Sequence, residues 1–292
     1  MSASGSVKLE AESGEAREFH FTARDFARVC RMIHARAGIS LAPGKEHLVY
    51  SRLSRRLRAT GQRRFDSYLQ ALEQDAESPE WEEFTNALTT NLTSFFREAH
   101  HFEQLRRHLQ TQPRGARPRI WCAAASTGEE PYSIAITAAE AYEQLPPPVE
   151  IIATDIDTQV LATAQDGIYP IERLEKMDRA RVRRFFRRGT GANEGLCRVV
   201  PELRDVIDFS PLNLLDTHWS VRGPFTAILC RNVMIYFDKP TQYKLLARLA
   251  GLLAPDGVLF VGHSESFQNI GDLLRPCGRT AYRRADGVRT AA

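Results

Sequence analysis

The hydrophobic pattern of the chain changes near Pro118, and this change separates two kinds of predicted structure. Before it, apolar residues recur every three or four positions, which is the period of amphipathic helices. After it, short apolar runs alternate with helical segments, which is typical of a mostly parallel sheet with crossover helices. The 292 residues therefore suffice for a small all-α domain followed by a larger α/β domain.

Residues 19–90 are predicted to form the all-α domain, with breaks at residues 42–44, Gly61 and residues 78–79. Residues 1–18 are rich in Ser, Gly and Glu, and we expect them to be a disordered tail. The α/β domain is predicted over residues 104–285, with a C-terminal tail at 286–292.

One region interrupts the alternation of the α/β domain. Residues 168–209 are rich in arginine and contain β-like stretches at 196–200 and 206–209. We expect an inserted small antiparallel β-subdomain on one edge of the main sheet.

Composition argues against secretion and membrane insertion. No apolar run reaches the ~18 residues of a membrane span, and the N-terminus has no signal-peptide core, so the cytoplasm is the expected location. The five cysteines include no Cys-x-x-Cys pair, so we expect neither a disulfide framework nor a zinc site. The adjacent His100 and His101 are interpreted as structural groups, and no metal is expected.

Positive charge is concentrated in the predicted all-α domain. In its second helix, Lys45, Arg52 and Arg56 fall on one side, beside an apolar stripe. With Arg55 they form a basic ridge. A solvated helix face and a docking site for an acidic partner are both compatible with this pattern.

A strand, a tight turn and a helix start follow one another at residues 120–133, Ile-Trp-Cys-Ala-Ala-Ala-Ser-Thr-Gly-Glu-Glu-Pro-Tyr-Ser. This is where α/β sheets bind nucleosides; small side chains let a ligand approach the backbone, and Gly128 permits a positive φ. Glu129 and Glu130 are unsuited to a phosphate, but they fit a ligand with hydroxyls or positive charge, such as S-adenosylmethionine. Alternatively, the two acids only favour a helix N-terminus.

Polar residues are also predicted at the ends of two other strands. Asp155 is placed to accept hydrogen bonds from ribose hydroxyls, while Asp157 is expected to cap the next helix. Residues 227–238, Ala-Ile-Leu-Cys-Arg-Asn-Val-Met-Ile-Tyr-Phe-Asp, lack the Asn-Pro-Pro-Tyr or Asp-Pro-Pro-Tyr typical of amine and nucleobase methyltransferases. Tyr236 is compatible with a site facing a transferred methyl group and with a core position.

Five blocks in order resemble one family. They are residues 86–102, the turn Ala-Ala-Ala-Ser-Thr-Gly-Glu-Glu-Pro-Tyr-Ser, and residues 213–215, 230–238 and 261–266. Together they look like the chemotaxis receptor protein-glutamate O-methyltransferases, the CheR family, over about residues 20–285. The turn lacks the Gly-x-Gly-x-Gly of most methyltransferases but matches this family. The resemblance implies an all-α domain followed by a class I, Rossmann-like, S-adenosylmethionine-dependent methyltransferase domain with an inserted antiparallel β-subdomain.

The resemblance also implies an activity. Members transfer the methyl group of S-adenosylmethionine to glutamate side chains of methyl-accepting chemotaxis receptors, giving methyl esters and S-adenosylhomocysteine, for sensory adaptation. A glutamate with a pKa of about 4.3 is ionised at neutral pH and needs no general base, which fits the absence of a recognisable base. The alternatives are a methyltransferase acting on a nucleic acid or small molecule, and a non-catalytic, cofactor-sensing receptor partner. We expect a monomer without nucleic-acid binding or membrane insertion.

The cofactor residues that the resemblance implies include a linker at residues 91–103. Glu130 is expected at the methionyl end of the cofactor, Asp155 at the ribose, and Asn213 and Leu214 around the adenine. The full set is Asn91, Thr93, Arg97, Glu130, Asp155, Asn213, Leu214, Arg231 and Asn232.

Substrate residues follow from the same resemblance. Arg97 and Tyr236 are expected at the reacting centre, Arg97 to grip a carboxylate and Tyr236 to donate a directing hydrogen bond. The basic ridge is expected to lie against acidic receptor helices. The loop with Arg188, Gly189 and Gly191 looks like the glycine-bearing loop of members that dock a receptor C-terminal pentapeptide. His263 lies in one of the family-like blocks, but no catalytic role follows from that position.

Overall fold

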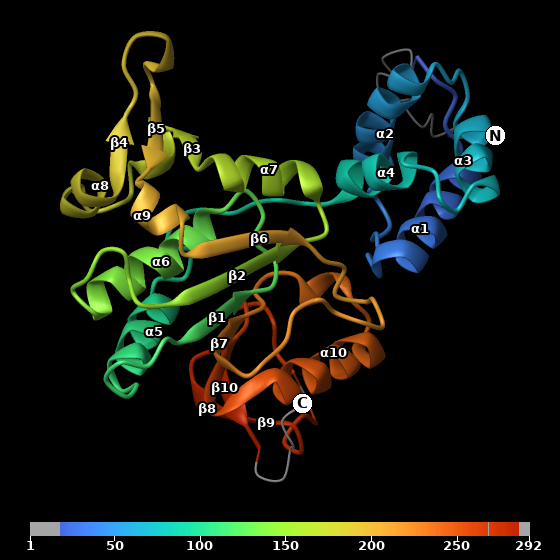
Figure 1. The fold of residues 1–292 in the computed structure, drawn as a ribbon. Helices are drawn as coiled ribbons and strands as arrows, with labels where there is room; N and C mark the ends of the chain where they lie inside the picture. The colour runs from blue at the N-terminus through green and yellow to red at the C-terminus, as the bar shows by residue number, and fades with distance from the viewer. Residues whose placement is uncertain (1–17, 268, 286–292) are drawn as a thin grey trace, which may run out of the picture.

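The computed structural model describes residues 18–267 and 269–285, in which a group of N-terminal helices lies beside an α/β sheet domain (Figure 1). The tails predicted at residues 1–18 and 286–292 lie outside the described residues, except for Glu18. Within the described part of the chain, no helix is both long and apolar enough to cross a membrane.

The N-terminal helices are α1 (Ala23–Ala37), α2 (Glu46–Thr60), α3 (Phe65–Gln74) and α4 (Glu80–Leu88). A capping box formed by Thr22 and Asp25 begins α1. Gly38 and Gly61 end α1 and α2 with φ of 67° and 69°, conformations that glycine adopts without strain. The helices share a buried core that includes Val29, Ile33, Val49, Leu53, Leu57, Phe65, Leu69 and Phe84.

The main sheet has the strand order β6-β2-β1-β7-β8-β10-β9. Neighbouring strands from β6 to β8 run parallel, whereas β10 is antiparallel to both β8 and β9. The strands are β1 (Arg119–Cys122), β2 (Glu150–Asp155), β6 (Ile207–Pro211), β7 (Phe225–Leu229), β8 (Leu253–Phe260), β9 (Leu274–Gly278) and β10 (Ala281–Arg284). The predicted mostly parallel sheet with crossover helices is confirmed.

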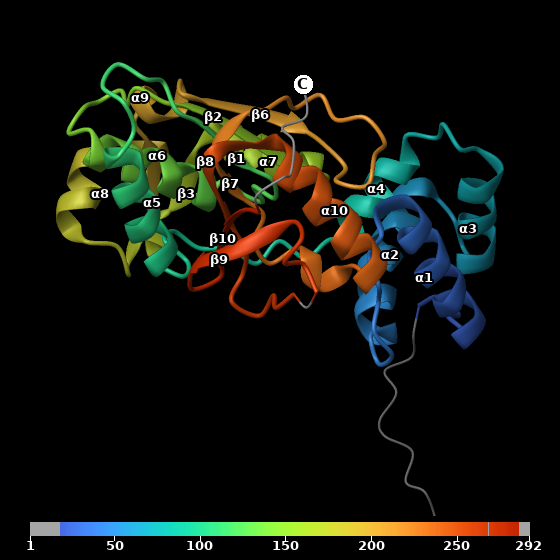
Figure 2. The same ribbon diagram turned by 90° about the horizontal axis from the view of Figure 1, so that it is seen from below.

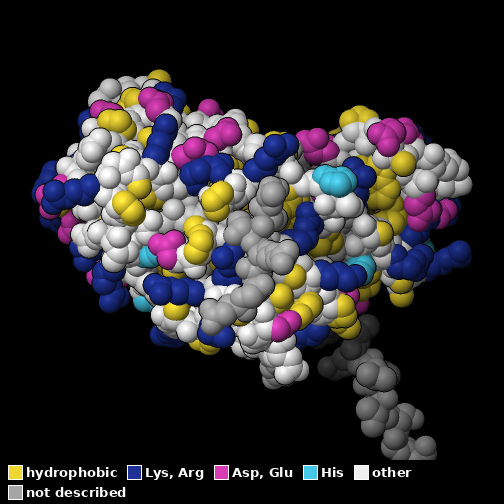
Figure 3. Space-filling view, turned by 60° about the horizontal axis from the view of Figure 1, so that its bottom comes forward, with side chains coloured by type: hydrophobic (Ala, Val, Ile, Leu, Met, Phe, Trp, Pro, Cys, Tyr) yellow, Lys and Arg dark blue, Asp and Glu magenta, His cyan; other side chains and the backbone are white. Residues whose placement is uncertain are grey.

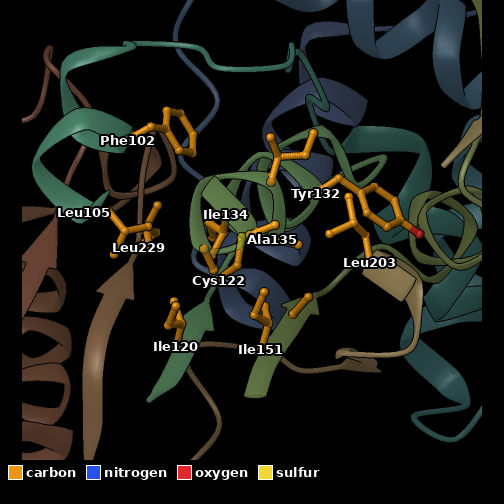
Figure 4. Close-up of a cluster of buried hydrophobic side chains, with 14 of the residues drawn as sticks. Phe102, Leu105, Ile120, Cys122, Tyr132, Ile134, Ala135, Ile151, Leu203 and Leu229 are labelled. Atoms are coloured by element: carbon orange, nitrogen blue, oxygen red, sulfur yellow. The ribbon is translucent and has the colours of Figure 1, made fainter. Parts of the chain in front are cut away.

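Helices cover both faces of this sheet because its strands are apolar on both sides. Alternate residues of β1 enter different cores, Ile120 and Cys122 one and Trp121 the other. On the first face lie α5 (His100–Gln110) and α6 (Glu129–Ala141), as Figure 4 shows. On the second lies α10 (Lys239–Leu252). The helix α7 (Thr158–Asp166) follows β2, and the short η3 (Met234–Tyr236) follows β7.

A small antiparallel sheet, ordered β3-β5-β4, forms the inserted subdomain. In Figure 1 its hairpin projects on the opposite side of the molecule from α1 to α4. Its elements are β3 (Ile168–Pro170), η1 (Ile171–Leu174), α8 (Arg179–Phe185), β4 (Phe186–Arg188), η2 (Gly191–Asn193), β5 (Leu196–Val199) and α9 (Pro201–Arg204). The predicted end of the subdomain at residue 209 differs from the structure, because Ile207–Pro211 is β6, an edge strand of the main sheet. A short β-like pattern does not specify which sheet a strand joins.

Candidate functional site

A cavity of about 500 Å³ lies at the carboxyl ends of β1, β2 and β7, and both parts of the molecule contribute to its lining. The segments that contribute to the lining include the small residues after β1, the linker, the exit of β7 and the connection between α1 and α2. The cavity is lined by every predicted cofactor-binding residue and by Tyr236, namely Asn91, Thr93, Arg97, Glu130, Asp155, Asn213, Leu214, Arg231, Asn232 and Tyr236. Ligands bind in α/β sheets at this edge, outside the carboxyl ends of the strands.

The turn between β1 and α6 has the predicted conformation at Gly128, whose φ is 96°. Ala123, Ala124 and Ser126 line the cavity, whereas Gly128 does not. A Cβ on Gly128 would lie 2.6 Å from the hydroxyl of Tyr169. The same Cβ would lie 2.9 Å from the backbone Cα of Ala164 in α7. The glycine is therefore required by its φ and by packing against α7 and Tyr169, and the small residues before it provide the approach to the backbone.

The two acids after this turn have different surroundings. Glu129 is buried away from the cavity, 3.5 Å from the guanidinium of Arg173. Glu130 faces the cavity, and its Oε2 accepts a hydrogen bond from Arg231 Nη1 at 2.6 Å. Only Glu130 is thus positioned to meet a cationic group of a ligand.

Arg231, at the exit of β7, connects Glu130 with the linker. Its side chain is fully buried, its Nη2 lies 3.3 Å from Glu98 Oε2, and the same nitrogen donates to the carbonyl of Arg97. His263 Nδ1 also contacts Glu98, at 3.1 Å. Burial raises the pKa of Glu98, but the hydrogen bond with His263 and the charge of Arg231 outweigh it and lower that pKa to about 2. The Glu98 carboxylate therefore stays charged, and its contacts with Arg231 and His263 fix the backbone next to Arg97.

Asp155, at the end of β2, is held by backbone donors. Its two oxygens accept hydrogen bonds from the N–H groups of Ser126 at 2.8 Å and Asp157 at 3.0 Å. Since a carboxylate offers about four acceptor positions, Asp155 retains capacity for hydroxyl groups of a ligand. Burial raises its pKa to about 6.

Asp157 caps α7, as predicted, by accepting from the N–H groups of Gln159 and Val160. Its other oxygen accepts from Thr89 Oγ1 and Asn91 Nδ2, each at 2.7 Å. Sequence reasoning missed this second role. The side-chain amide nitrogen of Asn91 therefore points toward Asp157, and the contact joins the end of the all-α domain to the sheet domain.

The loop after β7 is anchored by Glu265, which the sequence placed in a family-like block without a role. Its buried carboxylate accepts from the backbone N–H groups of Gly262, Met234 and Asn232 at 2.5, 2.8 and 3.1 Å. Desolvation raises its pKa. These bonds fix the loop that carries Arg231, Asn232 and Tyr236.

The N-terminal helices contact the sheet domain close to the cavity, and Figure 2 shows them beside α10. Asn213 Nδ2 donates to the carbonyl of Arg36 at 2.9 Å, and its Oδ1 accepts from the N–H of Leu215. Ser40 N–H donates to the carbonyl of Tyr236 at 3.0 Å. The backbone segments holding Asn213 and Tyr236 are thus positioned by contacts with the all-α domain.

The residues of the basic ridge are not equivalent. Arg56 is paired with Glu80 at 2.7 Å and Glu83 at 2.9 Å, and Arg52 donates to the carbonyl of Thr89 at 2.5 Å while lining the cavity. Lys45 and Arg55 are exposed, and neither has an ion pair among the described residues. Figure 3 shows acidic side chains among the Lys and Arg side chains of one face.

Arg188, Gly189 and Gly191 lie in the hairpin of β4 and β5 and are not part of the cavity lining. A Cβ on Gly189 would lie 2.1 Å from the carbonyl oxygen of Asn193, and Gly191 has a φ of 59°. Glycine is therefore required sterically at position 189.

Glu98, His100 and His101 bring three possible metal-ligand atoms within 4.8 Å of one another. The guanidinium of Arg231 lies 3.3 Å from the same Glu98, and its charge disfavours a cation there. His101 Nε2 lies 2.8 Å from Thr280 Oγ1. Burial and the charge of Arg231 lower the pKa of His101 to about 3. This supports a structural role for a neutral His101.

Comparison with known proteins adds independent information. The family model "CheR methyltransferase, all-alpha domain" matches residues 24–89, and "CheR methyltransferase, SAM binding domain" matches residues 91–283. Chemotaxis protein methyltransferase 2 of Pseudomonas aeruginosa is 54% identical over 270 residues, covering 92% of this chain and 96% of that protein. The chemotaxis protein methyltransferases of Salmonella typhimurium and Escherichia coli are 52% and 51% identical over 257 residues, covering 88% of this chain and 88% and 89% of those proteins. The chain belongs to the CheR methyltransferase family and is an S-adenosylmethionine-dependent methyltransferase.

Proposed function

We propose that this protein transfers the methyl group of S-adenosylmethionine to glutamate side chains of methyl-accepting chemotaxis receptors. The observation that carries the proposal is the convergence of Glu130, Asp155, Arg97 and Tyr236 on one cavity. The names of the relatives, chemotaxis protein methyltransferases, support the same substrate class.

The chemistry of the lining fits this cofactor. We assign Glu130 to its amino group and Asp155 to its ribose hydroxyls, because each is a carboxylate that lines the cavity and keeps free acceptor positions. Asn213 and Leu214 are assigned to the adenine, with Asn91, Thr93, Arg231 and Asn232 completing the site. When bound, S-adenosylmethionine supplies a methyl group on a positively charged sulfur.

The protein's own contribution to the reaction is placement. We assign Arg97 and Tyr236 to the incoming glutamate carboxylate, which they orient through charge-assisted and hydroxyl hydrogen bonds. With both reactants held in this way, a carboxylate oxygen would take the methyl group, forming a carbon–oxygen bond as the methyl–sulfur bond breaks and its electron pair stays on sulfur. Opposite charges are neutralised in this step, so a site with little water favours it. No residue has to remove a proton, because the carboxylate is already ionised.

Receptor docking is proposed at two places. Lys45 and Arg55 are the ridge cations free to meet an acidic helix, whereas Arg52 and Arg56 act mainly within the protein. The small sheet has β4 at one edge, and an extended receptor C-terminal pentapeptide is proposed to add there beside Arg188, Gly189 and Gly191. We further propose a monomer that acts in the cytoplasm.

The deciding experiment incubates the full chain with radiolabelled S-adenosylmethionine and receptor-containing membranes. Label in the receptor that is released by mild alkali, as methyl esters require, supports the proposal. Alkali-stable label, or transfer to RNA or a metabolite instead, favours the alternative methyltransferase. Tight cofactor binding with no turnover on any receptor favours a cofactor-sensing partner.

A further inference from the structure

Two large apolar side chains are exposed at the mouth of the cavity. Among the described residues, the exposed large hydrophobic side chains are Leu92 (77% exposed), Ile235 (50%), Tyr243 (41%) and Ile168 (39%). Leu92 and Ile235 both line the cavity, and the other two do not. The two most exposed members of this set therefore share one site.

Their positions in the chain place them next to the proposed reacting centre. The carbonyl of Leu92 accepts a hydrogen bond from Arg97 Nη1 at 2.8 Å, and Ile235 directly precedes Tyr236. Neither Leu92 nor Ile235 belongs to a hydrophobic cluster of the described residues. Core packing therefore does not account for a large apolar side chain at either position.

The backbone around both residues is fixed, so the side chains are held outward. Beside Leu92, Asn91 is bonded to Asp157 through its side chain and to Ser126 through its carbonyl. Beside Ile235, the N–H of Met234 donates to Glu265 at 2.8 Å, and its carbonyl accepts from Gln242 at 2.8 Å. Both exposed side chains thus belong to anchored segments.

The same cavity carries positive charge on the side of the all-α domain. Lys45 and Arg52 belong to its lining. A partner that satisfies both features has acidic residues and apolar residues on one face. On a helix, residues three or four positions apart lie on the same face, so an acceptor glutamate is flanked by side chains one turn away.

We propose that Leu92 and Ile235 form an apolar lip that packs against apolar side chains one turn from the acceptor glutamate on a receptor helix. The inference rests on the proposed function and deepens it. On docking, the lip removes apolar surface from water on both partners and helps to exclude water from the reacting centre. It makes the neighbours of the glutamate, as well as its charge, determinants of which sites are methylated.

The test compares Leu92→Ser and Ile235→Ser with Tyr243→Ser, an exposed apolar position on α10 outside the cavity lining. The lip variants are expected to raise KM for receptor about five- to tenfold, as expected for loss of a buried aliphatic contact, while the Kd for cofactor and the thermal midpoint stay unchanged. Tyr243→Ser leaves KM unchanged. Leu92→Met keeps a large apolar side chain at this position, so its KM for receptor is expected to stay close to the wild-type value.

A second arm changes the receptor. Replacing the apolar residues one turn from the acceptor glutamate by serine raises KM for wild-type protein, but adds little in Leu92→Ser, because the contact is already lost. If wild-type protein methylates the receptor, either of two results overturns the lip. One is an unchanged KM in Leu92→Ser, and the other is full additivity between Leu92→Ser and the serine substitutions in the receptor. Failure of wild-type protein to methylate any receptor instead overturns the proposed function.

Discussion

The carboxylate of Glu130 and the guanidinium of Arg231 form a buried ion pair, with Oε2 and Nη1 2.6 Å apart. Glu130 comes from the first turn of α6 and Arg231 from the exit of β7, so the pair joins two segments that line the cavity. Glu98 approaches the other arm of the same guanidinium at 3.3 Å. The charge of Arg231 is therefore shared between an acid of the sheet domain and an acid of the linker.

Replacing Glu130 by glutamine is expected to lower the free energy of unfolding by about 1–3 kcal/mol, because a buried charged donor loses its best partner. Glu98→Gln alone is expected to weaken the contact of residue 98 with the other arm of the Arg231 guanidinium. The double variant is expected to lose more than the sum of the two, since Arg231 is then buried without a counter-charge. Urea unfolding of the four proteins at pH 7 measures this, and additive losses contradict a shared charge.

Asp157→Ala is expected to destabilise the protein more than Asp178→Ala. Both side chains cap helices, and loss of a cap typically costs about 1 kcal/mol. Asp157 additionally accepts from Thr89 and Asn91, so its loss also removes the hydrogen bonds that join these two residues to the sheet domain. Equal changes in thermal stability of the two variants contradict a role for Asp157 between the two domains.

Arg97→Ala and Tyr236→Phe are expected to reduce methyl transfer more than cofactor binding, because both are assigned to the substrate carboxylate. A lost positioning hydrogen bond of this kind typically lowers the rate about ten- to a hundredfold. Calorimetric cofactor titration and single-turnover methylation separate the two effects. Equal losses in both assays reject a role at the reacting centre.

Acid is expected to weaken cofactor binding through Asp155. Burial raises its pKa from the ordinary 3.8 to about 6, so the folded protein holds this proton more tightly than the unfolded chain. The contribution of Asp155 to stability therefore falls as pH rises from about 3.8 to about 6. Cofactor affinity has the opposite dependence and rises over the upper part of this range, because hydroxyl groups need the ionised acceptor. Cofactor titrations from pH 5 to 8 are expected to show this dependence in the wild type and not in Asp155→Asn.

Charge reversal on the basic ridge is expected to have two different outcomes. Arg55→Glu changes an exposed cation and is expected to raise KM for receptor, with little effect on folding or cofactor affinity. Arg56→Glu places a third acid beside Glu80 and Glu83 and is expected to lower stability. Methylation kinetics and thermal unfolding of both variants distinguish docking from internal pairing; unchanged KM in Arg55→Glu removes Arg55 from the docking surface.

Features set by short-range rules were predictable from the sequence. The positive φ of Gly128 and the glycine that ends α2 follow from local backbone sterics. The first helix ends earlier than the break predicted at residues 42–44, at Gly38. The cap at Asp157 follows from its place before a helix. Of the residues around the cavity, Glu130, Asp155 and Tyr236 could be located because they follow strands whose carboxyl ends meet at one edge. The other predicted cofactor residues were implied by the family resemblance.

Contacts between distant segments were not predictable in the same way. The pairing of Arg56 with Glu80 and Glu83, the role of Glu265 and the bond between Asp157 and Asn91 depend on how separate helices and loops pack. The placement of β6 in the main sheet is of the same kind, because any apolar strand of suitable length fits either sheet edge.

The cavity is lined by both parts of the molecule, and this has a thermodynamic consequence. A ligand that touches both parts at once binds best when they are correctly placed, so cofactor binding and domain association share one linkage cycle. Cofactor concentration then sets how firmly the all-α domain is held to the sheet domain. A substitution outside the cavity lining, for instance at Gln159 of α7, whose side chain donates to Glu83 of α4, is then measured as a loss of cofactor affinity.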